Sequence, residues 1–161
     1  MFNQETQKVD HAALKANQVT IVLLSISAFV FNLPWLVFLV GSIMVLGVLR
    51  KAPGFDFIYQ YGLKPLGLKP DVLNDNPEPH QFSQLLGSTF MLAGAAFLFI
   101  NVTLVGWGLV WLVVALAALN AFGGFCVGCA LYYWLGRMKL PWFTKQPPPG
   151  TFPGMRPRGD A

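Results

Sequence analysis

The chain has 161 residues, of which 55% are hydrophobic and only 11% are charged, and its formal net charge is +4. A soluble domain usually contains about 25% charged residues, so this composition predicts an integral membrane protein that lies in a lipid bilayer. The sequence contains no phosphate-binding loop and no nucleic-acid-binding motif. We therefore expect no nucleic-acid partner, despite the positive charge.

Two long stretches, 19–49 and 82–135, contain no charged residue. A membrane-spanning helix needs about 20 apolar residues, so each stretch accommodates two helices once its flanks are added. Helix-breaking residues divide both stretches, around Asn32-Leu33-Pro34 and around Asn101. The predicted helices are 11–31, 34–51, 80–100 and 105–135. The predicted fold class is all-α: an integral membrane protein whose four transmembrane helices form two tandem helical hairpins.

The two predicted hairpins resemble each other in sequence. At an offset of 69, four residues of the first recur in the second: His11, Thr20, Leu23 and Asn32 align with His80, Thr89, Leu92 and Asn101. The shared order and shared helix boundaries favour a duplicated hairpin. Each copy has an even number of spans, so both copies would insert in the same orientation.

The positive charges predict which side of the membrane each segment occupies. All eleven Lys and Arg residues lie near the N-terminus, between residues 50 and 80, or after residue 136, and neither predicted hairpin tip has one. The positive-inside rule therefore places both termini in the cytoplasm. The predicted segments are a cytoplasmic arm (1–10), the first transmembrane hairpin (11–51), a cytoplasmic interfacial connection (52–79), the second transmembrane hairpin (80–135) and a basic, Pro/Gly-rich cytoplasmic tail (136–161).

The only two cysteines, Cys126 and Cys129, form a C-x-x-C motif that has three interpretations. In the first, both are small packing residues. Gly124 and Gly128 would then form a G-x-x-x-G contact face, and Asn120 would hydrogen-bond to a neighbouring helix. In the second, the cysteines are a dithiol that exchanges with a cytosolic thioredoxin-like or sulfurtransferase partner. Their expected place near the C-terminal end of a long helix weakens this interpretation, because helix N-termini are what stabilise thiolates.

The third interpretation is a metal site. His11 and His80 occupy equivalent repeat positions at one end of their helices, and the cysteines are expected at the same level in the membrane. Two cysteines and two histidines are a plausible zinc ligand set, so His11, His80, Cys126 and Cys129 are candidate ligands. No short ligand spacing links the histidines to the cysteines, however, and we expect no bound cofactor.

The segment N-A-F-G-G-F-C-V-G-C-A-L-Y-Y-W-L at 120–135, preceded by P-E-P-H-Q-F-S-Q-L-L-G-S at 77–88, resembles a bacterial family of small four-helix membrane proteins of unknown function. The resemblance covers about residues 8–140, and its specific part is a G-F-C-x-G-C signature formed by Gly124, Phe125, Cys126, Gly128 and Cys129. It implies a bacterial cytoplasmic membrane. It implies no established activity.

The sequence favours a non-catalytic accessory subunit of a larger membrane complex, such as a respiratory or photosynthetic electron-transfer complex, rather than an enzyme. The chain is small and its predicted spans contain few polar groups. A Pro/Gly-rich basic tail is extended or disordered when alone, so we expect other membrane subunits to hold it in place. The alternative function is a membrane dithiol redox or sulfur-relay protein.

Overall fold

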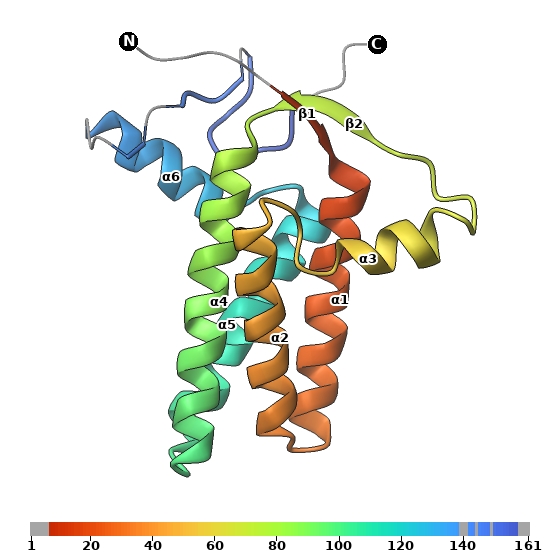
Figure 1. Cartoon of the computed structure of the whole chain (residues 1–161). Coiled ribbons are helices and arrows are strands. Elements are labelled where there is room, and N and C mark those ends of the chain that lie inside the picture. The colour runs from red at the N-terminus through yellow and green to blue at the C-terminus, as the bar shows by residue number, and fades with distance from the viewer. Residues whose placement is uncertain (1–6, 139–141, 144, 149, 158–161) are drawn as a thin grey trace.

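The computed structural model describes residues 7–138, 142–143, 145–148 and 150–157. The first six residues of the predicted arm and parts of the predicted tail lie outside these ranges. Four helices form the body: α1 (His11–Val30), α2 (Pro34–Leu49), α4 (Pro77–Phe99) and α5 (Thr103–Gly123). They make a ring, because α1 and α4 each pack against both α2 and α5 (Figure 1). The core lies between them and includes Ile21, Val40, Met91 and Val110.

The two tips that join these helices have the same backbone geometry. Asn32 and Asn101, which align in the sequence repeat, both adopt left-handed conformations, with φ of 51° and 62°. The residue after each asparagine donates its N–H to a carbonyl five positions back, from Leu33 to Ala28 and from Val102 to Phe97. This is a Schellman helix end, and asparagine tolerates the left-handed position better than most residues.

Three of the four helices, α1, α4 and α5, are long and apolar enough to cross a membrane. This supports the predicted membrane protein. The helix α2 is apolar but has only 16 residues. At about 1.5 Å per residue it extends about 24 Å, less than the hydrocarbon core of about 30 Å. The structure therefore supports three candidate spans rather than the predicted four.

The polar end of the ring, opposite the two tips, contains a small sheet that the all-α prediction missed. Strand β1 (Gln7–Asp10) pairs antiparallel with β2 (Val72–Asp75), with Gln7 opposite Asp75. The connection also contains the short helix α3 (Asp56–Ile58), which continues into the π-helical turn η1 (Tyr59–Leu63) (Figure 1). The sheet places Asp75 directly before α4, at the edge of the helical ring.

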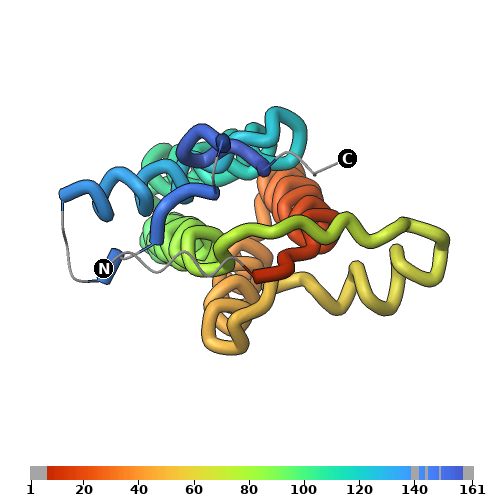
Figure 2. The backbone as a smooth tube through the Cα atoms, turned by 90° about the horizontal axis from the view of Figure 1, so that it is seen from above, coloured from red at the N-terminus to blue at the C-terminus, as the bar shows by residue number. Residues whose placement is uncertain are grey.

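The predicted fourth helix, 105–135, is wrong at its C-terminal end. α5 ends at Gly123, and a separate helix, α6 (Val127–Arg137), leaves the ring at an angle (Figures 1 and 2). Gly124 ends α5 with a left-handed φ of 64°, which glycine adopts without strain, while Phe125 pairs with Met155. Gly124 therefore belongs to the break, and the predicted G-x-x-x-G face with Gly128 does not form on one continuous helix.

Candidate functional site

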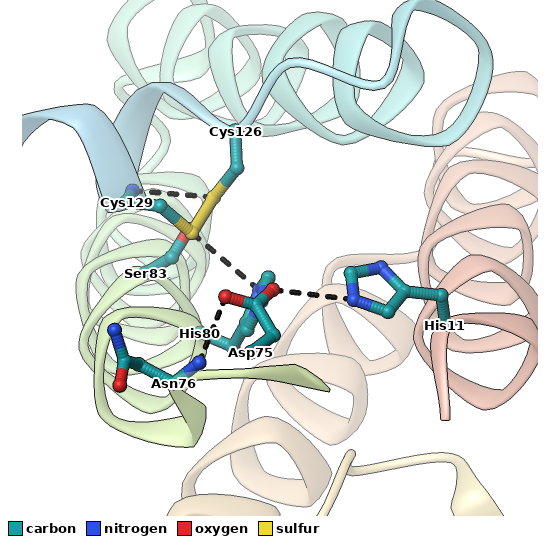
Figure 3. Close-up of a disulfide and its surroundings, with 7 residues drawn as sticks. All are labelled: His11, Asp75, Asn76, His80, Ser83, Cys126 and Cys129. Carbon is teal, nitrogen blue, oxygen red and sulfur yellow. Dashed lines mark hydrogen bonds and ion pairs between the residues drawn. A yellow bond between two sulfur atoms is a disulfide. The ribbon is translucent and has the colours of Figure 1, made fainter. Parts of the chain in front are cut away.

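The break between α5 and α6 places the cysteine pair at the beginning of a helix. Cys126 is the N-cap of α6, and its Sγ accepts a hydrogen bond from the backbone N–H of Cys129 at 3.2 Å. The two cysteines are joined by a disulfide, with 5.2 Å between their Cα atoms (Figure 3). Both are buried. The expected position near a helix C-terminus is thus wrong, since the pair occupies the helix end that favours a thiolate.

A histidine and a carboxylate extend from the cysteine pair in a line. The Nδ1 atom of His80, in α4, lies 3.5 Å from the Sγ of Cys129, and its Nε2 atom lies 2.9 Å from Oδ2 of Asp75 (Figure 3). When Nε2 donates its proton to Asp75, the neutral imidazole has a free lone pair on Nδ1. That nitrogen can then take a proton from a Cys129 thiol. We call Asp75, His80, Cys126 and Cys129 the sulfur site.

Asp75 is held by a second histidine, from the other copy of the repeat. Nε2 of His11 lies 3.2 Å from Oδ2 of Asp75, at ion-pair distance but without hydrogen-bond geometry. Burial alone would raise the pKa of the Asp75 carboxyl, but interactions with both histidines and the N–H of Asn76 hold it well below its usual range. Asp75 therefore stays ionised and keeps His80 oriented toward the sulfur atoms.

The sulfur site forms one wall of a polar pocket of about 240 Å³ at this end of the ring. Both cysteines line it, together with His11, Asp75 and His80. Positive charge also reaches it from Lys15, which is among its lining residues; Arg156 lines it too, but its charge is paired with Asp71. Since nearby cations and a helix N-terminus both stabilise a thiolate, the pocket suits a reactive dithiol better than the predicted apolar environment does.

Packing explains part of the signature, as the first interpretation proposed. α6 approaches α4 so closely that a Cβ atom on Gly128 would lie 2.8 Å from the Cα of Ser83. The Oγ of Ser83 lies 3.3 Å from the Sγ of Cys126. The side chain of Asn120, expected to bond to a neighbouring helix, makes no hydrogen bond within the described ranges. It lines the polar pocket instead.

The C-terminal tail covers the sulfur site from the other side. The N–H of Cys126 donates to the carbonyl of Gly154 at 2.7 Å, and the N–H of Arg156 donates to the carbonyl of Gly124 at 3.0 Å. The side chain of Arg156 forms an ion pair with Asp71. This tail segment, 154–156, is thus bonded to the backbone and side chains of the same chain.

The four candidate metal ligands lie in two overlapping groups. His80 is close enough to Cys126 and Cys129 to share a metal ion with them, and it is also close enough to His11 and Asp75. The predicted set of two cysteines and two histidines therefore does not converge on one point, because Asp75 lies between the histidines. Zinc binds thiolates, which a disulfide does not provide, so only the reduced protein would offer it the first group.

Sequence reasoning missed two residues of this cluster, Asp75 and Ser83. The sequence did contain a signal for Asp75. This acidic residue lies two positions before P-E-P-H, the first turn of a helix that begins with proline and contains His80. Ser83 lies three residues after His80, on the same face of α4. Nothing in the C-x-x-C motif itself predicts that this serine would contact Cys126.

Comparison with known proteins yields one family. A family model described as a domain of unknown function, DUF4395, matches residues 9–137. That range contains all four helices of the ring, α6 and every residue of the sulfur site. Neither a curated protein nor a solved structure gives a match. Because the family model covers most of the 161 residues, the chain belongs to the DUF4395 family.

Proposed function

We propose that this protein is a membrane dithiol–disulfide exchange protein whose reactive pair is Cys126 and Cys129. One observation carries the proposal: an Asp75–His80–Cys129 line of contacts ends on a disulfide at the N-terminus of a helix. Packing alone does not require an ionised carboxylate and an oriented imidazole beside a sulfur atom. Charged groups are costly to bury, so this arrangement is better explained by proton transfer during thiol chemistry.

The exchange proceeds in two steps. In the first, the Cys126 thiolate, favoured by the N–H of Cys129 and by the helix N-terminus, attacks a sulfur of the partner's disulfide. This forms a mixed disulfide and releases one partner thiolate. In the second, His80 removes the proton of the Cys129 thiol, and the resulting thiolate attacks Cys126. The internal disulfide forms and the second partner thiolate leaves, so the pair has lost two electrons and the partner has gained two. The same two steps run in reverse when the partner arrives as a dithiol, and the pair then gains the two electrons that the partner loses.

A thioredoxin-like protein is the partner class we propose, since it presents a disulfide of the same kind on an exposed helix end. It would approach through the polar pocket, where the lining side chain of Lys15 adds positive charge. A sulfurtransferase partner would instead leave a persulfide on Cys126, which mass spectrometry of the intact protein distinguishes from a mixed disulfide.

We further propose that α2 completes a four-span bundle in a bacterial cytoplasmic membrane, with the sulfur site on the cytoplasmic side. The support is that the described basic residues lie outside the two tips. The polar segments that contain many of them gather at the end of the ring that holds the sulfur site (Figure 1). Loops rich in Lys and Arg stay in the cytoplasm.

The predicted role as a non-catalytic accessory subunit of an electron-transfer complex stays a prediction. One of its supports was the need for a partner to hold the tail. The tail segment 154–156 bonds to Gly124 and Cys126 of the same chain, and the expectation that other subunits hold the tail also stays a prediction.

The test uses the purified, reduced full-length protein and an aromatic disulfide that releases a coloured thiolate. We expect two phases: a first that depends on probe concentration, and a second, intramolecular one as Cys129 attacks Cys126. Cys129→Ser should stop after the first phase with a stable adduct on Cys126. Cys126→Ser should react more slowly in the first phase. If neither cysteine reacts until the protein is denatured, the pair is structural and the proposal fails.

A further inference from the structure

A second pocket lies inside the helical ring, on the membrane side of the sulfur site. Its volume is about 320 Å³, within the range of about 300–1,000 Å³ typical of small-molecule sites. Most of its lining is apolar and comes from helices of the ring together with the first turns of α6, including Ile21, Met44, Phe90, Val113 and Leu131. Leu131 is 39% exposed, so the lining reaches the outer surface of the molecule. We call this the apolar pocket.

Cys126 belongs to both pockets. It lines the polar pocket with Cys129 and the histidines, and it lines the apolar pocket without them. Among the described residues, only Cys126, Gln18 and Asn120 are common to the two linings. The sulfur of Cys126 therefore separates a polar cavity at the end of the ring from an apolar cavity at membrane depth.

The few polar side chains of the apolar pocket differ in how they are bonded. Asn17 accepts a hydrogen bond from the N–H of Phe55, and Gln84 donates to the carbonyl of Met44. The amides of Gln18 and Asn120, which line both pockets, have no hydrogen-bond partner among the residues that the structure describes. An amide that is free at the end of an apolar cavity can donate to a carbonyl oxygen of a bound molecule.

We infer that the apolar pocket binds a lipid-soluble quinone that exchanges electrons with Cys126 and Cys129. The inference rests on the proposed dithiol function and supplies the second redox partner that a catalytic disulfide needs. A quinone matches the site in three ways: its ring and tail are apolar, its carbonyl oxygens accept hydrogen bonds, and it dissolves in the bilayer that the pocket's lining reaches.

In the proposed reaction, one dithiol and one quinone are converted to one disulfide and one quinol. The Cys126 thiolate adds to a ring carbon of the quinone and forms a C–S bond. The Cys129 thiolate then attacks the sulfur of Cys126, which forms the disulfide and breaks the C–S bond, and the electron pair of that bond stays on the ring. The pair loses two electrons and the quinone gains them. The two protons on the quinol oxygens replace the two lost from the thiols, one of which passes through His80.

The experiment follows the reduced full-length protein in lipid nanodiscs, without oxygen, after a short-tailed benzoquinone is added. We expect quinone absorbance to fall as the disulfide forms. Mass spectrometry of the intact protein must show the loss of two hydrogens, because a quinone that simply adds to a thiol increases the mass instead. The aromatic-disulfide assay, run on the same samples, reports separately whether the dithiol itself works.

Two glycines provide a matched pair of variants. A side chain on Gly87, which lines the apolar pocket, would meet the end of Met44, whereas one on Gly108 would meet open space. Gly87→Leu should slow quinone reduction by about tenfold or more, and Gly108→Leu should not change it. Asn120→Leu should also slow it. Should Gly87→Leu damage the fold, as the aromatic-disulfide assay would reveal, Asn120→Leu decides.

Two results would overturn the inference while leaving the proposed function intact. One is normal exchange with the aromatic disulfide but no disulfide formation with quinone. The other is equal quinone reduction by the wild type and both pocket variants, Gly87→Leu and Asn120→Leu. In the second case, loss of co-purified phospholipid from Gly87→Leu would show that the pocket holds an acyl chain instead of a quinone. Failure of both assays in the wild type would instead refute the dithiol function itself.

Discussion

Replacing Asp75 by asparagine should slow the second, intramolecular phase of thiol exchange and leave the first phase unchanged. The side chain keeps its size and an acceptor oxygen, but the carboxylate that lies 2.9 Å from Nε2 of His80 loses its charge. His80 becomes positively charged when it takes the Cys129 proton, so the carboxylate stabilises that state. Cys126 does not depend on this base, because its thiolate is favoured by the helix N-terminus.

The size of the effect follows from the two kinds of hydrogen bond. A hydrogen bond to a charged group contributes about 1.5–3 kcal/mol, whereas one between neutral groups contributes about 1 kcal/mol. Asp75→Asn should therefore remove about 0.5–2 kcal/mol of stabilisation from the protonated imidazole. If all of this appears in the transition state of the second step, its rate falls about 2- to 30-fold.

Stopped-flow measurement of thiolate release separates the two phases, because only the first depends on probe concentration. Asp56→Asn is the matched control, since Asp56 bonds to Gln60 on the connection and does not line the polar pocket. An unchanged second phase in Asp75→Asn would show that His80 is not the base, and the proton-transfer reasoning would be wrong. If Asp75→Asn slows both phases equally, Asp75 stabilises the fold and does not assist proton transfer by His80.

Three further predictions concern the surroundings of the sulfur site. Arg156→Ala removes the ion pair of the tail segment 154–156, and we expect faster alkylation of the reduced cysteines, measured by mass spectrometry over time. Gly128→Val should cost about 1–3 kcal/mol of stability, because its Cβ meets the backbone of Ser83, whereas Gly108→Val should leave the melting temperature in detergent nearly unchanged. The pKa of the Asp75 carboxyl is lowered in the folded protein, so the ionised carboxylate stabilises the fold at pH values above its ordinary pKa of 3.8. This stabilisation is lost as the pH falls below 3.8. The difference in unfolding midpoint between wild type and Asp75→Asn should therefore shrink below pH 3.8.

The helical ring could be predicted because its signals are local. Long uncharged stretches specify apolar helices, and Asn32 and Asn101 end them through a left-handed conformation that asparagine tolerates. The repeat also placed His11 and His80 at equivalent helix starts, and the structure brings their rings to 5.7 Å. What the sequence could not show is that a carboxylate from a neighbouring strand would lie between them.

The break at Gly124 was missed because its local signal, the consecutive pair Gly123-Gly124, was passed over and Gly124 was interpreted with Gly128 as a helix-packing face. No proline or charge marks the segment 120–135, and small residues spaced four apart are common in membrane helices. The break is stabilised from a distance, by backbone bonds from the tail segment 154–156. This single error reversed the electrostatic environment expected for the cysteines, from a helix C-terminus to a helix N-terminus. It therefore also changed which interpretation of the C-x-x-C motif the protein supports best.

The side of the membrane on which the sulfur site lies determines the direction of electron flow. In a background where both native cysteines are serine, Asn32→Cys at a tip should react with an impermeant maleimide added to intact cells. Lys69→Cys in the connection should react only after the cells are opened.

That result would place the native cysteines beside the cytosolic thiol pool, which keeps dithiols reduced. A disulfide there turns over only if an oxidant re-forms it, and the apolar pocket is where a membrane-soluble oxidant would reach Cys126. Electrons would then pass from cytosolic thiols to the quinone. The opposite labelling pattern would expose the pair to an oxidising compartment, and the quinol would instead be the donor that keeps Cys126 and Cys129 reduced.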